Sequence, residues 1–268
     1  MEIGSVEGAG RSFVMRRNAG ILALLLFPVF LLADEPVSEL PFQPGETLNY
    51  DLKWGLFPVG SATMKVLPKK DEGDDGFHRL SFSVRTNEFA DAFYKVRTNV
   101  TSVVDRTFSK SMRYEKSQKE GKTKREIEVL FDYDAGKASY FESGRLVSTL
   151  PIPSQVLDPL SIAYFFRLGE LKAETETILP TCDGKKLKMI KVRTGKIEKI
   201  RVPAGTFKAM GTVPEMKDLS GVFKKSPEGI LRIWYSADSR KIPVRISSKV
   251  VVGSFTARLV SAEGLKGE

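Results

Sequence analysis

Residues 47–66 read TLNYDLKWGLFPVGSATMKV, and the alternation in this stretch decides the fold class. Apolar side chains take every second position on both sides of a break at 55–60. They are Leu48, Tyr50, Leu52 and Trp54 before the break, and Ala62, Met64 and Val66 after it. Successive side chains of a β-strand point to opposite faces, so the pattern predicts two half-buried strands. The break contains Gly55, Pro58 and Gly60, which predicts that the strands form a hairpin.

The same alternation recurs along the rest of the chain. It predicts strands at 80–84, 96–104, 113–118, 124–133, 137–142, 185–193, 196–202, 206–213, 229–236, 243–252 and 254–260. About a dozen strands is more than a flat sheet holds comfortably. We therefore expect a mainly β fold, in which a curled antiparallel sheet forms a β-roll or an open barrel.

One segment of the chain after the N-terminal region has a helical pattern. Asp158 can cap it, Pro159 suits the first turn because its missing N–H would be unpaired there, and Gly169 can end it. The apolar residues at helical spacing are Leu160, Ala163, Tyr164 and Leu168, with Phe165 and Phe166 beside them. A helix this apolar must be covered. We expect one central helix, from Asp158 to Gly169, that packs on the sheet or plugs a barrel.

The N-terminus has the layout of a secretion signal. Arg16 and Arg17 precede an apolar run at 21–33, which is short for a membrane span. Ala33 supplies the small residue that a signal peptidase needs, so we expect residues 1–33 to be a signal peptide. A retained anchor or a core strand is the alternative, and Met15 is an alternative start.

After cleavage, residues 34–268 are predicted to form one β-rich domain. No later stretch is apolar enough to span a membrane, and no cysteine stands at the cut for lipid attachment. The expected location is the periplasm or the cell exterior.

The chain is basic, with a formal net charge of +9. Removal of residues 1–33 leaves +8, because that segment holds three arginines and two glutamates. Such a charge attracts anionic lipid head groups, lipopolysaccharide or acidic glycans, although it also serves solubility. The hairpin around Gly121 mixes both signs of charge and lacks interleaved aromatic residues. It is therefore predicted to be solvated, and no nucleic-acid binding is expected.

The chemistry-bearing residues are sparse. Cys182 is the single cysteine and His78 the single histidine, which excludes an internal disulfide and a multi-cysteine zinc site. Cys182 is expected to be buried. The chain lacks a glycine-rich phosphate loop, a His-Glu-x-x-His motif and a Gly-x-Ser-x-Gly elbow. No catalytic residue, metal or cofactor is predicted, and a carboxylate pair assembled across the fold is left open.

A cluster late in the chain combines groups that bind sugars or anionic head groups. Trp234 offers an aromatic face, Asp238 a carboxylate, and Arg240 and Arg245 guanidinium groups. These four residues are the first candidate binding site. The alternative is a hairpin turn at 238–241, with Trp234 in the core and Asp238 bonded to its own backbone.

The central helix is the second candidate. It could act as a lid or plug over an apolar interior, through Asp158, Tyr164, Phe165 and Arg167. The alternative is a permanently packed core helix. The aromatic segment 88–94 could line the mouth of such an interior or anchor a turn.

Several motifs taken together resemble one bacterial family. They are Gly45-Glu46-Thr47-Leu48-Asn49-Tyr50 with Gly60, Tyr94-Lys95-Val96-Arg97 with Ser102 and Asp105, the Asp158-Pro159 helix ending in Arg167, and 233–238 with Ile242-Pro243-Val244. Their order over residues 40–262 resembles the domain-of-unknown-function family 3108 of exported envelope proteins. The resemblance implies a mostly antiparallel, curled β fold with no established activity. Thr98 departs from the pattern, which has an acidic residue after the arginine.

Three functions fit these observations. The leading hypothesis is a non-enzymatic binding protein for an amphiphile, a glycan or another envelope component. It would bury apolar parts in the curled sheet and hold anionic parts with Lys and Arg. The second is a structural or assembly factor that binds another envelope protein through a strand edge or the hairpin at Gly121. The third is a hydrolase with two facing carboxylates, one of raised pKa.

Overall fold

The computed structural model describes residues 40–68, 76–215, 230–250 and 253–267. They belong to one compact unit, Ser38–Glu268. The predicted signal peptide at 1–33 lies outside the described residues, as do position 229 and positions 251–252 of two predicted strands.

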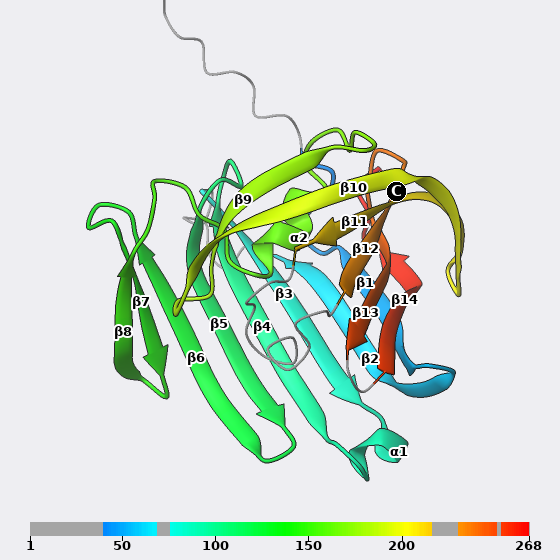
Figure 1. Ribbon diagram of the computed structural model, residues 1–268, viewed down its shortest axis with the longest axis horizontal. Helices are drawn as coiled ribbons and strands as arrows, with labels where there is room; N and C mark the ends of the chain where they lie inside the picture. Colours follow the sequence, from blue (N-terminus) through cyan, green and yellow to red (C-terminus); the bar gives the residue numbers. More distant parts are fainter. Residues whose placement is uncertain (1–39, 69–75, 216–229, 251–252, 268) are drawn as a thin grey trace, which may run out of the picture. The chain divides into compact units, whose positions relative to one another are not determined.

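The described residues form a single antiparallel sheet of fourteen strands (Figure 1). The strands are β1 (Thr47–Trp54), β2 (Phe57–Leu67), β3 (Phe77–Thr86), β4 (Val96–Asp105), β5 (Ser111–Glu120), β6 (Thr123–Asp132), β7 (Lys137–Glu142), β8 (Arg145–Pro151), β9 (Glu176–Cys182), β10 (Leu187–Val202), β11 (Gly205–Pro214), β12 (Ile230–Ser236), β13 (Pro243–Val250) and β14 (Gly253–Glu263). Two short helices, α1 (Glu88–Asp91) and α2 (Ser161–Phe165), interrupt them.

The sheet is a meander made of two halves. Strands that neighbour each other in the sheet also follow each other in the chain, except that β1 pairs with β14. This pairing joins the half β1–β8 to the half β9–β14 and leaves β8 and β9 as the two edges. The sheet is therefore curled without being closed, and the predicted fold class is confirmed.

The β9 edge folds back over the N-terminal half of the sheet, as Figure 1 shows. The turn between β9 and β10 meets β6 and β7, where Gly184 lies against Val129 and Tyr140. Lys185 places its Nζ 4.3 Å from the centre of the Tyr140 ring. Contacts between side chains thus take the place of strand pairing at this side of the sheet.

The core lies on the face that the sheet curls around. It receives the even-numbered side chains of the first strands, such as Leu48, Tyr50, Met64 and Leu80, as the alternation predicts. Cys182 is buried, as expected, and burial raises the pKa of its thiol to about 11. A thiol with that pKa is protonated at neutral pH and is a poor nucleophile.

Three strand predictions need correction. The two strands predicted at 185–193 and 196–202 are one long strand, β10, with an irregular register between Thr194 and Ile197. The edge strands β8 and β9 were missed, since their side chains do not alternate cleanly and β9 contains Pro180. Proline is tolerated at a sheet edge because an edge strand needs fewer paired N–H groups.

The predicted helix from Asp158 to Gly169 is wrong in length, because α2 spans only Ser161–Phe165. The N-cap position is Leu160 and not Asp158, but the Oδ1 of Asp158 still accepts the N–H groups of Leu160 at 2.8 Å and Ser161 at 3.0 Å. After Phe165 the chain tightens, since the N–H of Arg167 bonds the carbonyl of Tyr164 at 2.9 Å. The physical reason is that the Arg167 side chain is held by groups outside the helix, described below.

Candidate anion-binding face

Four cations stand side by side on the outer face of the sheet. Direct cross-strand pairing runs from Arg85 on β3 to Arg97 on β4. It continues to Lys119 on β5 and then to Lys124 on β6. Direct partners share a face, and the neighbouring inward positions Val84 and Thr98 belong to the other face. We call Arg85, Arg97, Lys119 and Lys124 the cation row.

The cation row costs stability unless an anion offsets it. Like charges placed directly opposite each other on neighbouring strands repel, and the strands are only about 4.8 Å apart. Among the described residues, no ion pair joins Arg85, Lys119 or Lys124 to a carboxylate. A bound anion would relieve this repulsion at all four positions at once.

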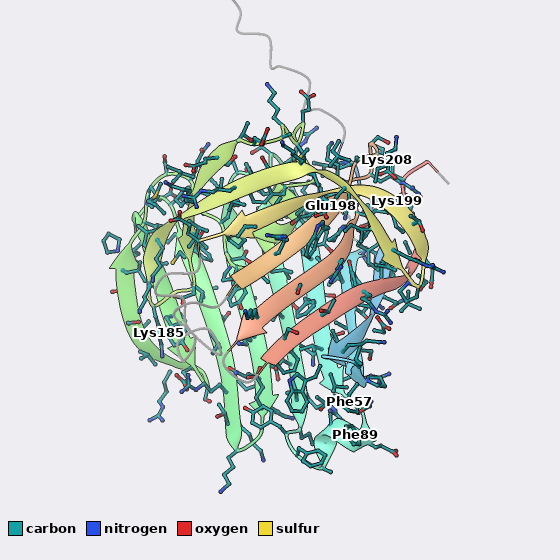
Figure 2. All side chains as sticks on the ribbon, turned by 45° about the vertical axis from the view of Figure 1, so that its right-hand side comes forward. Phe57, Phe89, Lys185, Glu198, Lys199 and Lys208 are labelled. Carbon is teal, nitrogen blue, oxygen red and sulfur yellow. The ribbon has the colours of Figure 1, made fainter. Side chains whose placement is uncertain are left out.

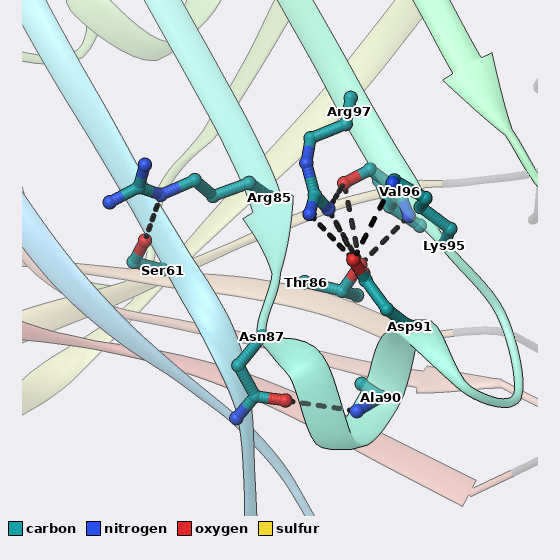
Figure 3. Close-up of polar contacts among 9 residues, drawn as sticks. All are labelled: Ser61, Arg85, Thr86, Asn87, Ala90, Asp91, Lys95, Val96 and Arg97. Atoms are coloured by element: carbon teal, nitrogen blue, oxygen red, sulfur yellow. Dashed lines mark hydrogen bonds and ion pairs between the residues drawn. The ribbon is translucent and has the colours of Figure 1, made fainter.

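Arg97 is the member of the row that has a carboxylate partner. Its two Nη atoms bond the carboxylate of Asp91 on α1 at 3.0 and 2.6 Å, as Figure 3 shows. Thr86 also donates its hydroxyl to that carboxylate, and these contacts lower the pKa of Asp91. Arg85 instead donates from Nε to the Ser61 hydroxyl at 3.3 Å. The guanidinium of Arg97 is thereby fixed, while Arg85 keeps donors available.

A row of short polar side chains lies beside the cation row. Direct cross-strand pairing continues across five strands through Asn49, Thr63, Ser83, Asn99 and Ser117. Lys65 stands on the far side of this row, two residues along β2 from Thr63. Short side chains between longer ones leave a hollow, and a groove of about 380 Å³ lies here.

The groove is lined by hydroxyl, amide and cationic groups. Its residues include Lys65, Arg85 and Arg97 as well as the polar row from Asn49 to Asn99, and no carboxylate is among them. Guanidinium groups bind phosphate and carboxylate by paired hydrogen bonds, and amides and hydroxyls suit the hydroxyls of a sugar. The groove can therefore hold a hydroxylated anion.

A second groove, of about 370 Å³, continues along β4–β6 and is acidic. Glu115 and Glu128 are direct cross-strand partners in it. Arg113 lies between them, with Nη2 at 2.8 Å from Glu115 and 2.7 Å from Glu128. One guanidinium therefore bridges the two facing carboxylates.

The structure brings the four sequence-predicted binding residues together as two pairs. Trp234 is buried, with 6% of its surface exposed, and donates its indole N–H to Glu198. The Arg245 guanidinium stacks 4.9 Å from the centre of the Trp234 rings. The Arg245 guanidinium therefore covers the aromatic face on which a sugar would stack.

Asp238 and Arg240 form the second pair, with Arg240 Nη2 at 2.9 Å from the Asp238 carboxylate. Asp238 also accepts the Arg240 backbone N–H and the Ser236 hydroxyl. Burial raises the pKa of Asp238, but the bonds from Arg240 and Ser236 outweigh it and the net shift is downward. These contacts are the ones expected for a hairpin turn at 238–241, in which Asp238 bonds the local backbone.

The four helix residues proposed for a lid or plug are firmly held. Arg167 donates to both carboxylate oxygens of Glu46, at 2.5 and 2.9 Å, and to the backbone carbonyl of Arg240. Its guanidinium also lies 4.8 Å from the ring of Phe42 and 5.6 Å from that of Tyr164. The contacts tie α2 to the start of β1 and to the turn before β13.

The N-terminal side of α2 is held by a buried polar cluster. The carboxylate of Asp158 accepts the hydroxyls of Ser102 and Ser111 as well as two backbone N–H groups. Phe165 packs on a second apolar cluster around Tyr235 and Phe166. These contacts match a packed core helix more closely than a lid.

Sequence reasoning missed the cation row because it considered each strand by itself. The four cations lie on four different strands, and only the register brings them into line. Their outward positions were readable from the alternation, but the sequence carries no direct statement of which residues are partners.

Within the described part of the chain, no group of three or more His, Cys, Asp or Glu residues could hold a metal ion. Neither helix found there has the length and apolar character that crossing a bilayer requires.

The fold and this face define a curled, open β-sheet protein with a cationic outer groove. The chain belongs to the family described as "Protein of unknown function (DUF3108)", whose model matches residues 49–260. The membership of this family that the sequence motifs predict is therefore confirmed over residues 49–260, and export stays a prediction. No curated protein matches the chain.

The chain is similar to several solved structures, and the first of those described here shares its fold. A β-barrel-like protein of the DUF1849 family from Brucella abortus is 12% identical, with a TM-score of 0.56, and the match covers 84% of this chain and 99% of that one. A candidate exported protein with a YmcC-like fold from Bacteroides fragilis is 10% identical, with a TM-score of 0.29 and coverage of 84% and 98%. A candidate lipoprotein from Parabacteroides distasonis is 11% identical, with a TM-score of 0.33 and coverage of 84% and 97%.

Proposed function

We propose that this chain is an exported, non-enzymatic binding protein of the bacterial envelope, and that its outer groove holds an anionic, hydroxyl-rich component. The ligand class is an acidic saccharide, either free or as the phosphorylated head group of a lipopolysaccharide. The observation that carries the proposal is the cation row beside the polar groove.

The chemistry of the groove selects this ligand class. The cation row supplies charge at regular intervals, because its members stand on adjacent strands. The polar row supplies donors and acceptors: Asn49 and Thr63 bond each other at 3.1 Å. Among the described residues, no side-chain hydrogen bond occupies Ser83 or Asn99. A neutral glycan would leave Arg85, Lys119 and Lys124 without a counter-charge, and an apolar ligand would satisfy neither row.

The remaining sequence features fit the same role. Arg16 and Arg17 followed by the apolar run to Ala33 have the layout of a signal peptide, which supports a periplasmic or extracellular location. The net charge of the chain is positive, which draws a polyanion toward the surface before contact.

A paired-variant binding experiment tests the proposal. The probes are an oligogalacturonate, lipopolysaccharide and a neutral oligosaccharide of matched length, measured by calorimetry at low and physiological salt. Arg85→Gln with Lys119→Gln should weaken binding of an acidic probe at least about tenfold, because each lost charge-assisted bond is worth about 1.5–3 kcal/mol. The oligogalacturonate and lipopolysaccharide arms separate a free saccharide from a lipid head group.

The matched control removes the same charge elsewhere. Lys199 and Lys208 are direct cross-strand partners on β10 and β11, and Figure 2 shows them at the opposite end of the sheet from Phe57 and Phe89. Lys199→Gln with Lys208→Gln should change the affinity less than about twofold. Equal weakening by both double variants, or no binding of either acidic probe, would overturn the proposal.

A further inference from the structure

An exposed group of aromatic side chains forms one end of the sheet. Trp54 stacks on Phe255 at 6.3 Å and is the direct cross-strand partner of Phe57. Phe57 stacks on Phe89 at 6.5 Å, and Phe89 contacts Phe93 at 5.5 Å. These five side chains, which we call the aromatic tip, form one continuous group from the ends of β1, β2 and β14 and from the connection between β3 and β4.

The aromatic tip is solvent-exposed to an unusual degree. Phe93 is 80% exposed and the neighbouring Leu56 is 87% exposed. Figure 2 shows Phe57 and Phe89 at the extreme lower end of the sheet, near α1. Scattered single apolar residues are normal on a surface, whereas a contiguous exposed group indicates an interaction site.

The scaffold under the tip is ordered by specific contacts. Asn87 caps α1 by accepting the N–H of Ala90 at 2.9 Å and donates to the carbonyl of Pro58 on β2 at 2.9 Å. The Asp91–Arg97 pair ties the other end of α1 to β4, and Figure 3 shows this pair together with the Asn87 cap on Ala90. Phe89 and Phe93 are therefore presented on a fixed support, with their apolar surface already displayed.

Lysines surround the tip. Lys53 precedes Trp54 and Lys95 follows Tyr94. The turn between β5 and β6 carries Lys122 next to Gly121, whose N–H bonds the Lys95 carbonyl at 2.8 Å and whose Cα faces the Tyr94 ring. Glu88 is an exposed acid of this end, and Asp91 is engaged by Arg97 and Lys95. The four cations of this end, Lys53, Lys95, Arg97 and Lys122, outnumber its three acids, Glu88, Asp91 and Glu120, by one.

Aromatic tips ringed by lysines match one partner chemistry. Tryptophan, tyrosine and phenylalanine settle at the boundary between lipid head groups and acyl chains, and lysines beside them bind anionic head groups. We infer that the aromatic tip docks the protein on the surface of an anionic bilayer, with the sheet standing clear of it. This inference is independent of the ligand in the outer groove.

A vesicle-binding experiment tests this docking. The protein purified after export is sedimented with vesicles of phosphatidylglycerol and phosphatidylcholine, and with phosphatidylcholine alone. Binding should require phosphatidylglycerol and should shift the fluorescence of Trp54 to the blue. Trp234 is buried, so it contributes little to that shift, and Trp54→Phe should abolish it.

Matched variants separate insertion from general stickiness. Phe89→Ser with Phe93→Ser should lower the vesicle partition coefficient at least about tenfold. If the double variant folds poorly, Phe93→Ser alone replaces it. This variant changes the most exposed ring and should give a smaller but measurable loss of binding. Ile178→Ser with Met189→Ser removes two apolar side chains that are 54% and 63% exposed on β9 and β10, and should have less than about a twofold effect.

Three outcomes would overturn the inference. The first is undiminished sedimentation of Phe89→Ser with Phe93→Ser. The second is sedimentation without a Trp54 shift, which means adsorption by charge alone. The third is self-association of the protein in the absence of vesicles, if the double variant abolishes it. The tip would then bind a second copy of the chain.

Discussion

Arg167 and Glu46 show how much one buried pair can determine. Their side chains are 0% and 1% exposed, and they come from the start of β1 and the end of the α2 segment. Two buried charges that have lost their hydrating water are stable only when they pair with each other in good hydrogen-bonding geometry. The pair therefore fixes the position of the central segment more than it adds to stability.

The first prediction concerns this pair. Glu46→Gln keeps the shape of the side chain but leaves the Arg167 charge buried without a counter-ion. The free energy of unfolding should fall by about 3–5 kcal/mol, measured by urea unfolding. Replacing both residues by methionine should recover much of the loss, because the uncompensated charge is then absent.

The control for this prediction is an exposed pair. Lys196 and Glu174 lie 3.6 Å apart with 78% and 67% of their side chains exposed. Glu174→Gln should change the free energy of unfolding by less than about 0.5 kcal/mol. A similar cost for Glu46→Gln and Glu174→Gln would contradict the role given to the buried pair.

At the scale of elements, α1 illustrates how a helix of four residues is held. Its own hydrogen bonds are too few for stability, since a helix needs several turns before propagation outweighs nucleation. The tethers are the Asn87 cap and the Asp91 carboxylate, which binds Arg97. The element therefore depends on ionised Asp91.

The second prediction follows from the pKa of Asp91, which the hydrogen bonds from Arg97 and Thr86 lower below its ordinary value of 3.8. A carboxyl with a lowered folded-state pKa contributes stability that is complete above the ordinary value and is lost as pH falls through the lowered one. The amide hydrogens of Phe93 and Tyr94, which bond the Ala90 carbonyl, should lose protection in that acid range.

Asp91→Asn is the matched variant for this measurement. It should show weak protection of the same two amides already at neutral pH, with no further loss on acidification beyond the intrinsic exchange rate. An acid-dependent loss of equal size in Asp91→Asn would assign the effect to another group.

At the scale of the whole molecule, the two ends of the sheet meet without pairing as strands. Gly184 lies where the β9–β10 turn touches β6 and β7, with a positive φ of +87°. A Cβ placed there would come within 2.5 Å of Val129 and 2.8 Å of Tyr140. The close approach of the two halves of the sheet therefore requires glycine at this position.

The third prediction compares two glycines. Gly136 also has a positive φ, +62°, but a Cβ there would meet nothing within 4 Å. Gly136→Ala should cost only the backbone term of about 1–2 kcal/mol. Gly184→Ala should cost about 1–3 kcal/mol more, because the added methyl group also overpacks the contact. Equal losses in urea unfolding would show that the two halves do not touch tightly at Gly184.

The sequence by itself determined the class of fold. The alternation in 47–66 and in the later strands predicts which side chains face the core. The reason is that odd and even positions of a strand point to opposite faces. The residue type of Cys182 indicated its burial, and the Asp158-Pro159 pair indicated where a helix begins. The edge strand β8 escaped prediction because none of its side chains is buried, so no alternation is imposed on its sequence.

Tertiary structure decided what the sequence left open. The length of α2 depends on Glu46, which is 121 residues from Arg167 in the chain. The cation row depends on the register of four strands, and the aromatic tip on strand ends and the α1 connection that meet at one end of the sheet. Each feature depends on residues that are far apart in the chain and close together in space. The local sequence pattern does not say which remote residues become neighbours.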